Sequence, residues 1–129
     1  MRSRTLTCFT AAVLLTALAI PVRLSAQAPT FTVLHAFTGL SDGAFPSASL
    51  VRDNAGDLYG TTEGGGAYGH GVVFKLGATG KETVLHSFTG GKDGAFPAGR
   101  LVRDSAGNLY GTTQSLGAFR HGVVFKLTP

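Results

Sequence analysis

The sequence predicts an all-β protein of two four-stranded antiparallel sheets of the β-propeller blade type, an incomplete propeller preceded by a helical signal peptide. Three observations support this prediction. Residues 32–76 align with residues 83–127 without a gap at a spacing of 51, and 32 of the 45 aligned positions are identical. A period of roughly 40 to 50 residues is typical of propeller blades. Each copy also consists of short β-branched and aromatic segments between glycines, and both faces of those segments are apolar.

The first 28 residues have the layout of a secretory signal peptide. Arg2 and Arg4 form a basic start, and an apolar run of about fourteen residues follows over positions 9–22. This run is too short to span a membrane, which takes about twenty apolar residues. Small residues then mark a cleavage site, which we place after Ala26 or Ala28. We therefore expect export to the periplasm, the extracellular space or the cell surface, with no membrane span after removal of the signal.

The composition beyond the leader excludes several classes of function. Three of the eleven basic residues and none of the seven acidic residues lie in the leader, so the mature chain carries a net charge of about +1. This balance, with no run of basic residues, argues against a nucleic-acid partner. Cys8 is the only cysteine and also lies in the leader, so the mature chain has no disulfide and no thiol chemistry.

The mature part, residues 29–129, is expected to be two tandem repeats of four short strands each. Glycine-rich turns separate the strands, as in β-hairpins. In the first repeat we expect the strands over residues 50–53, 57–62, 71–76 and 82–88. The second repeat reaches the end of the chain after its third strand. Phe31–Phe37 matches the fourth strand and is expected to be a strand that stands alone before the first repeat.

Apolar side chains on both faces of the strands predict a sheet packed between neighbours. One face of the third strand is formed by Val72, Phe74 and Leu76. The opposite face has Val73 and the stem of Lys75. In the fourth strand, Leu85 is expected to oppose Val84 and Phe88, because side chains alternate along a regular strand.

The motif LVRDxAGxLYGTT, present in both copies, predicts a hairpin turn. The Asp53 carboxylate can accept a hydrogen bond from the backbone N–H two residues on, and Gly56 can take the positive φ of the turn. Gly60 leaves room where strands or sheets crowd. We interpret Asp57 and its counterpart Asn108 as interchangeable turn residues.

The chain resembles a known repeat family through three motifs: LVxDxAGxLYGTT, GxGVVFKL and ETVLHSFTGGxDGxxP. Together they are similar to the bacterial GloVer repeat of choice-of-anchor tandem repeat proteins, and the match covers residues 32–127. The resemblance implies an exported or cell-surface protein built as a β-propeller. Members usually carry more repeats and a variable C-terminal anchor, whereas this chain has two repeats and ends at Pro129 without a hydrophobic tail or sorting motif.

Neither the histidines nor the acids have the spacing of a metal or catalytic site. The four histidines form two counterpart pairs, His35 with His86 and His70 with His121. No H-x-x-x-H or carboxylate–histidine spacing occurs within a repeat, and we interpret the histidines as structural hydrogen-bonding groups. Turn chemistry accounts for the duplicated aspartates, so we expect no catalytic pair, no metal and no cofactor.

The loop between the second and third strands differs most between the copies. It is Glu63–Gly69 in the first copy and Gln114–Arg120 in the second. Variable loops on a fixed scaffold are where binding specificity usually lies. The candidate ligand-binding residues on or beside these loops are Tyr68, His70, Phe119, Arg120 and His121. Tyr68 and Phe119 are the aromatics to test first, and an aromatic packed against the edge of the sheet is the structural alternative.

These observations predict a secreted or cell-surface, non-enzymatic repeat protein with a structural or binding role. Two blades cannot close a ring, since propellers take about four to eight. We therefore expect either a fragment that lacks further blades or a protomer that self-associates. Its ligand would be an extracellular glycan or protein. The alternatives are part of a carbohydrate-active propeller enzyme, or a lectin-like binder with one weak glycan site per repeat.

Overall fold

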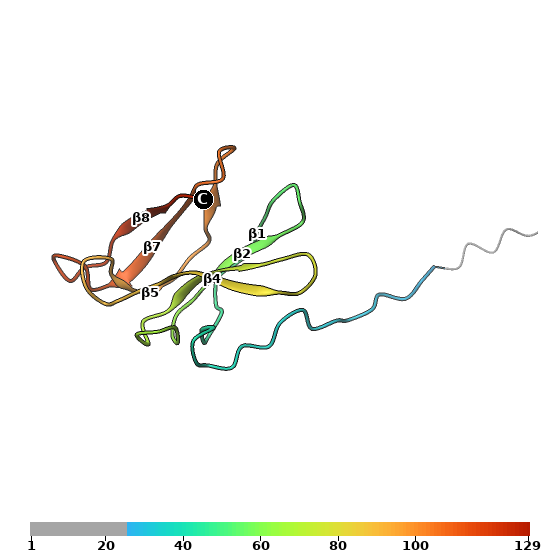
Figure 1. Ribbon diagram of the computed structural model, residues 1–129, viewed down its shortest axis with the longest axis horizontal. Coiled ribbons are helices and arrows are strands. Elements are labelled where there is room, and N and C mark those ends of the chain that lie inside the picture. Colours follow the sequence, from blue (N-terminus) through green and yellow to red (C-terminus); the bar gives the residue numbers. More distant parts are fainter. Residues whose placement is uncertain (1–25) are drawn as a thin grey trace, which may run out of the picture. The chain divides into compact units, whose positions relative to one another are not determined.

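The computed structural model describes residues 26–129, and within that range the chain is all-β, with no helix (Figure 1). Eight strands form two four-stranded antiparallel sheets, both within the compact unit of residues 32–129. The predicted signal peptide, residues 1–28, lies almost entirely outside the described residues. Among the described residues there is no helix long and apolar enough to cross a membrane.

The first sheet follows the order of the chain. Its strands, in the order β1-β2-β3-β4, are β1 (Val51–Arg52), β2 (Leu58–Thr62), β3 (Val72–Leu76) and β4 (Glu82–Ser87). Every neighbouring pair is antiparallel, as in a run of hairpins. The four strands expected for the first repeat are confirmed, and each lies within its expected range.

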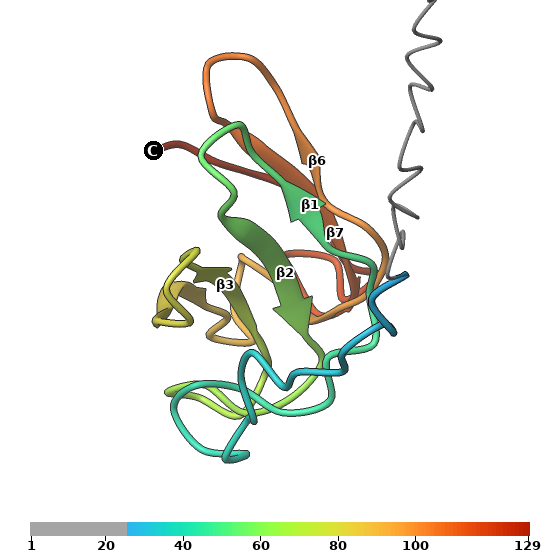
Figure 2. The same ribbon diagram turned by 90° about the vertical axis from the view of Figure 1, so that its right-hand side faces the viewer.

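The second sheet is built around one long central strand. Its strands are β5 (Ala95–Pro97), β6 (Val102–Arg103), β7 (Leu109–Ser115) and β8 (Val124–Leu127). β6 pairs with β7 as β1 pairs with β2, and β8 pairs with β7 as β3 pairs with β2. Figure 2 shows β1 and β2 of the first sheet and β6 and β7 of the second. β5 pairs with the far end of β7 and not with β8, so it does not occupy the position that β4 has beside β3. In the first repeat the corresponding pairing is a single bridge between Ala44 and Gly64.

The strand expected at Phe31–Phe37 is wrong. These residues have no strand pairing, and Phe31, Val33 and Leu34 are exposed. The physical reason lies in their counterpart β4, which is a strand because β3 pairs with it. Among the described residues before residue 31 there is no strand equivalent to β3 with which residues 31–37 could pair. Phe37 is half-buried and its ring packs on Phe74 at a centroid distance of 5.1 Å.

Two core clusters lie on opposite faces of the first sheet. Val72, Phe74 and Leu76 form the outer cluster, and Val73 belongs to the cluster shared with the second sheet. The predicted alternation along the third strand is therefore confirmed. The shared cluster joins Tyr59 and Val73 of the first sheet to Leu101 and Leu109 of the second. Both faces of the first sheet are thus apolar, and one of them is covered by its neighbour.

A β-bulge in β4 overturns the expectation that Val84 and Phe88 share a face. Val73 pairs with His86 and Phe74 pairs with Val84, so Leu85 is the extra residue. Val84 therefore packs in the outer cluster, whereas Leu85 and His86 both line spaces on the side of the second sheet. Phe88, two residues beyond His86, follows it into the shared cluster.

Glycine in the middle of the second strand of each repeat makes room for an aromatic ring. A Cβ at Gly60 would lie 2.6 Å from Cζ of Phe74 and 2.7 Å from Cδ2 of Leu50. At Gly111 the corresponding distances, to Phe125 and Leu101, are 2.5 and 2.8 Å. The prediction that this glycine relieves crowding is confirmed in both copies.

Gly60→Ala and Gly111→Ala are each expected to lower the free energy of unfolding by about 1–3 kcal/mol, because the added methyl group overpacks a filled space. Gly77→Ala is the matched control, since its Cβ would come no closer than 3.5 Å to its neighbours. Urea unfolding of the three variants, followed by circular dichroism, measures the difference. A Gly77→Ala loss as large as the other two would contradict the crowding argument.

Candidate functional site

The Asp53 carboxylate organises the turn between β1 and β2. Its Oδ1 accepts hydrogen bonds from the N–H groups of Ala55 at 3.0 Å and Asp57 at 2.9 Å. Its Oδ2 accepts one from the Tyr59 hydroxyl at 3.0 Å. Gly56 has a φ of 92°, which glycine adopts without the usual steric penalty. The turn chemistry predicted for this motif is therefore confirmed, and Asp53 is used as a structural acceptor.

The second copy has the same hydrogen bonds around its turn aspartate, Asp104, but Asn108 in the position of Asp57 makes different contacts. Asp104 accepts hydrogen bonds from the Tyr110 hydroxyl at 3.0 Å and from Nδ2 of Asn108 at 2.8 Å. The carboxylate of Asp57, by contrast, forms an ion pair with Lys75 at 2.5 Å. The interpretation of Asp57 and Asn108 as interchangeable is wrong, because one holds a cation and the other donates to the turn aspartate.

The two turn aspartates are stabilised in their charged form. Burial acts to raise the pKa of Asp53, but the donors of its turn and the Arg103 guanidinium outweigh it and lower the pKa below its ordinary value. The Asn108 side chain is the main cause that lowers the pKa of Asp104, and burial opposes it. Both carboxyl groups therefore favour the folded state when they are ionised.

Acidification is expected to weaken the fold through these aspartates. A pKa that is lower in the folded chain than the unfolded value of 3.8 gives stability that is present above that pH. It is lost as the pH falls through the folded pKa. Asp104→Asn should unfold at lower urea than the wild type at pH 7 and lose less stability on acidification. Ser105→Asn, an exposed change in the same turn, is the control and should keep the pH dependence of the wild type.

A cavity of about 400 Å³ lies between the two sheets. Tyr59 and Lys75 line it from the first sheet, and Arg103 lines it from the second. Lys75 Nζ lies 5.8 Å and Arg103 Cζ 5.5 Å from the centre of the Tyr59 ring, within range of a cation–π contact. Both cations also have carboxylate partners, Asp57 for Lys75 and Asp53 for Arg103. The cavity is therefore lined by a largely neutralised network around an aromatic ring.

Arg103 is a residue whose role the sequence reasoning missed. It reaches across from β6 to Asp53 of the first sheet, with 3.9 Å between Nη2 and Oδ2. Its counterpart Arg52 is exposed, although both guanidinium groups lie beside the glycine of their own turn, Gly56 and Gly107. The motif is identical around both arginines, so the sequence does not indicate this difference. The Arg103–Asp53 contact forms because the first sheet packs against the second.

Histidine–aspartate pairs tie each fourth-strand segment to the loop that follows. His86 Nε2 lies 3.1 Å from Oδ2 of Asp93, and His35 Nε2 lies 3.4 Å from Oδ2 of Asp42. The statement that no carboxylate–histidine spacing occurs within a repeat is therefore wrong. A spacing of seven residues, present in both copies, was the available signal. Among the described residues there is no cluster of three or more potential metal ligands.

Thr89 fixes Asp93 in the loop of this pair. The backbone N–H of Thr89 donates to Oδ2 of Asp93 at 2.9 Å, and its hydroxyl donates to Oδ1 at 2.5 Å. Burial acts to raise the pKa of Asp93, but the Thr89 donors and His86 outweigh it and lower the pKa. Thr38 and Asp42 repeat both hydrogen bonds. The histidines 35 and 86 thus belong to a duplicated structural motif.

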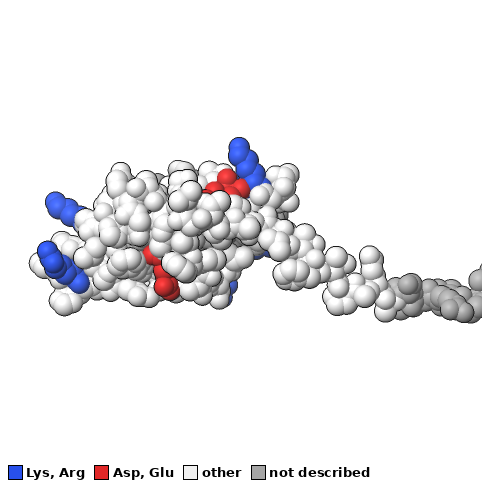
Figure 3. Space-filling view, turned by 90° about the horizontal axis from the view of Figure 1, so that it is seen from below, with Lys and Arg blue, Asp and Glu red and all other residues white. Residues whose placement is uncertain are grey.

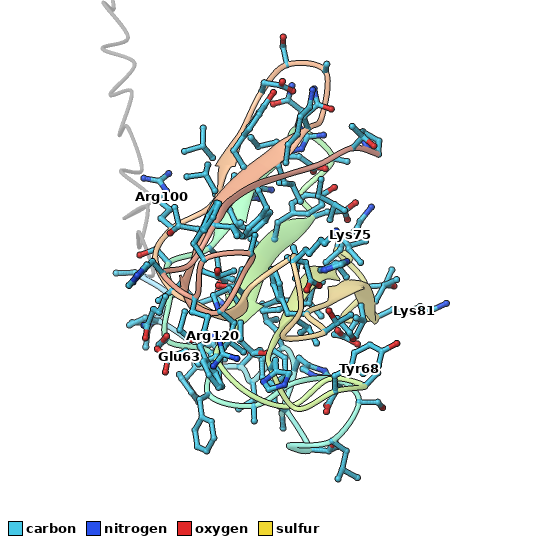
Figure 4. All side chains as sticks on the ribbon, turned by 90° about the vertical axis from the view of Figure 1, so that its left-hand side faces the viewer. Glu63, Tyr68, Lys75, Lys81, Arg100 and Arg120 are labelled. Carbon is cyan, nitrogen blue, oxygen red and sulfur yellow. The ribbon has the colours of Figure 1, made fainter. Side chains whose placement is uncertain are left out.

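The candidate loop residues lie in different environments. Tyr68 is 60% exposed and Phe119 is 86% exposed. Arg120 and His121 are also exposed. Figure 4 shows the Tyr68 and Arg120 side chains on the loops, away from Lys75 on the sheet. The alternative of aromatics packed against the edge of the sheet does not hold for these two rings.

His70 differs from the other candidates because it is half-buried and packs against the second repeat. Its ring meets Phe96 edge-on at 5.6 Å, and its backbone carbonyl accepts a hydrogen bond from the Phe96 N–H at 3.0 Å. A Cβ at Gly90 would lie only 2.6 Å from the same ring. His70 therefore joins the loop of the first repeat to the start of the second sheet, whereas its counterpart His121 is exposed.

Comparison with protein families now adds to this geometry. Residues 20–129 match the Gloeobacter/Verrucomicrobia repeat. The chain belongs to this repeat family. The resemblance to the GloVer repeat is thereby confirmed. Comparisons with curated proteins and with solved structures give no match.

The family match covers both sheets of this Gloeobacter/Verrucomicrobia repeat protein. The duplicated polar groups, the turn aspartates and the histidine–aspartate pairs, are engaged within their own repeat in both copies. The differing loops hold the exposed aromatic rings. Within this repeat protein, the loops are therefore the candidate binding site and the duplicated groups are its frame.

Proposed function

We propose that this protein is an exported, non-enzymatic scaffold of propeller type that binds a ligand through its variable loops. The signal-like leader supports export. A first sheet with apolar clusters on both faces supports blade-like packing against neighbours on each side. Membership of the repeat family does not by itself identify an activity, so the argument for binding rests on the loops.

The observation that carries the binding role is the contrast between frame and loops. The turn aspartates and the histidine–aspartate pairs are duplicated and contact groups of their own repeat, whereas Tyr68 and Phe119 project into solvent from the segments that differ most. Exposed aromatic rings provide large contact areas at little entropic cost, which is why aromatics are enriched at binding surfaces.

A glycan is the ligand class that we favour. The face of the protein in Figure 3 is mostly uncharged, with a few acidic and basic side chains and no large patch of either sign. A neutral, hydroxyl-rich ligand suits such a surface better than a polyanion. With one aromatic loop in each repeat, weak sites would add up on a repeating polysaccharide.

A glycan array tests this role with the purified mature chain. We expect binding that Tyr68→Ala/Phe119→Ala abolishes and that Phe31→Ala, an exposed phenylalanine outside both sheets, leaves intact. Binding that survives the double variant would overturn the loop site. Turnover of any polysaccharide on the array would overturn the non-enzymatic role and favour the alternative of a carbohydrate-active enzyme.

Export has a separate test. The full chain, expressed in a bacterium with a general secretion pathway, should leave the cytoplasm and begin at Gln27 or Pro29, as read by mass spectrometry. Retention of the intact leader in the cytoplasm would contradict export and leave the loop-binding experiment unaffected.

A further inference from the structure

The two sheets of one chain pack through unlike faces. We call the face with Val51, Tyr59 and Val73 the front face of the first sheet. It shares a core cluster with the back face of the second sheet, formed by Leu101, Leu109 and Phe125. The internal contact is therefore front on back, a geometry that continues in one direction from repeat to repeat.

The 51-residue shift identifies two matching faces that carry exposed apolar side chains. The front face of the second sheet consists of Val102, Tyr110 and Val124, and the back face of the first sheet includes Leu50 and Leu58. Val73 is 0% exposed and its counterpart Val124 is 81% exposed. Leu101 is 2% exposed and Leu50 is 45% exposed. Val73 and Leu101, which are buried in the internal contact, thus have counterparts that are largely uncovered. Phe74 on the back face of the first sheet is the exception, because Phe37 packs against it.

One strand at the edge of the second sheet also lacks a partner that its counterpart in the first sheet has. β3 pairs with β2 and with β4, whereas β8 lies at the outer edge of its sheet and pairs only with β7 among the described residues (Figure 1). Residues 32–37, the counterpart of residues 83–88 in β4 and just beyond it, pair with no strand. Shifting the β3–β4 register by 51 places Thr32 opposite Lys126 and His35 opposite Val124.

The cavities show the same relation, in which residues that lie between the two sheets have counterparts on an outer face of the chain. Arg103, Leu109 and Leu127 are the second sheet's part of the cavity between the sheets. Their counterparts, Arg52, Leu58 and Leu76, line a cavity of about 340 Å³ on the outside of the first sheet. In the cavity between the sheets, Tyr59 and Lys75 lie on the other side, and their counterparts Tyr110 and Lys126 lie on the front face of the second sheet.

We propose that copies of this chain associate head to tail. The front face of the second sheet packs on the back face of the first sheet of the next copy, whose residues 32–37 add to β8 as a fourth strand. Arg52 of the next copy then pairs with Asp104, as Arg103 pairs with Asp53 within one chain. The partner is a second copy, because these faces repeat an interface that this chain already forms with itself. The inference rests on the propeller-type scaffold proposed above.

Head-to-tail contacts close into rings when the rotation allows it. With two repeats per copy and about four to eight blades per ring, the expected assembly holds about two to four copies. Size-exclusion chromatography with light scattering on the mature chain measures this number. We expect Val124→Asp, at an exposed position of the front face, to give a folded monomer, and Ser105→Asp, in an exposed turn, to keep the assembly. A monomeric wild type at its highest soluble concentration would overturn the proposal.

A disulfide tests the strand pairing itself. Opposed residues of antiparallel strands lie about 4.5–5.5 Å apart between Cα atoms, within reach of a disulfide. Thr32→Cys/Lys126→Cys should join copies on oxidation, and Thr32→Cys/Arg120→Cys, with the second cysteine on a loop, should not. A bond within one chain, or equal cross-linking of the control, would overturn the pairing. Neither measurement involves a glycan, so a negative result in either one would not affect the loop-binding proposal, which the glycan array tests separately.

Discussion

Phe88→Ala is expected to lower the free energy of unfolding by about 3–5 kcal/mol. Phe88 is 1% exposed, and its ring meets Phe125 of β8 edge-on at 5.2 Å. It follows β4 directly, so it carries the end of the first sheet into the core that both sheets share. Truncation would leave a void at the contact between the sheets. Urea unfolding followed by circular dichroism measures the loss, which is a large part of the 5–15 kcal/mol typical of a domain.

The repeat provides the control for this prediction. Phe37 is the counterpart of Phe88, and its ring meets Phe74 at nearly the same distance, 5.1 Å, but it is only half-buried. Phe37→Ala should therefore cost clearly less. Both variants are best compared in the Val124→Asp background, where association between copies does not contribute. Equal losses would show that the second sheet adds nothing to the burial of Phe88.

Local features of this fold were predictable from the sequence because each is decided within a few residues. The Asp53 turn depends on an acceptor and a glycine three positions apart, and both are visible in the motif. The alternation along β3 depends only on the period of a strand. The expected strand at Phe31–Phe37 failed because a strand also needs a neighbour, and composition does not say whether one is present.

Features that depend on the second sheet could not be read from one repeat. Arg52 and Arg103 stand in the same motif, yet only Arg103 reaches Asp53 of the other sheet. The bulge at Leu85 arises from the β3–β4 pairing, and because of it Phe88 packs in the shared cluster instead of in the outer cluster with Val84. His70 is packed and His121 exposed for the same reason. The sequence duplication thus predicts the structure within each repeat well, but it does not reveal contacts that form only where one sheet packs against the other.

Leu101→Ala is expected to lower the free energy of unfolding by about 2–5 kcal/mol, because this side chain is 2% exposed in the core between the sheets. Its methyl groups also lie over Gly111, so the surrounding backbone has little freedom to collapse into the void. The counterpart Leu50 is 45% exposed. In a monomer, Leu50→Ala should cost about 1 kcal/mol, in proportion to the smaller apolar area that it buries.

The same pair of variants separates the stability of one chain from that of the assembly. If the back face of the first sheet packs on the preceding copy, Leu50 is buried in the wild type, and Leu50→Ala should cost nearly as much as Leu101→Ala. In the Val124→Asp background the Leu50→Ala loss should shrink, whereas the Leu101→Ala loss should stay the same, since its partners lie within the chain. Chemical denaturation of the four proteins, with the two background proteins as references, measures both differences. A Leu50→Ala loss that is the same in both backgrounds would show that nothing from a second copy covers this face.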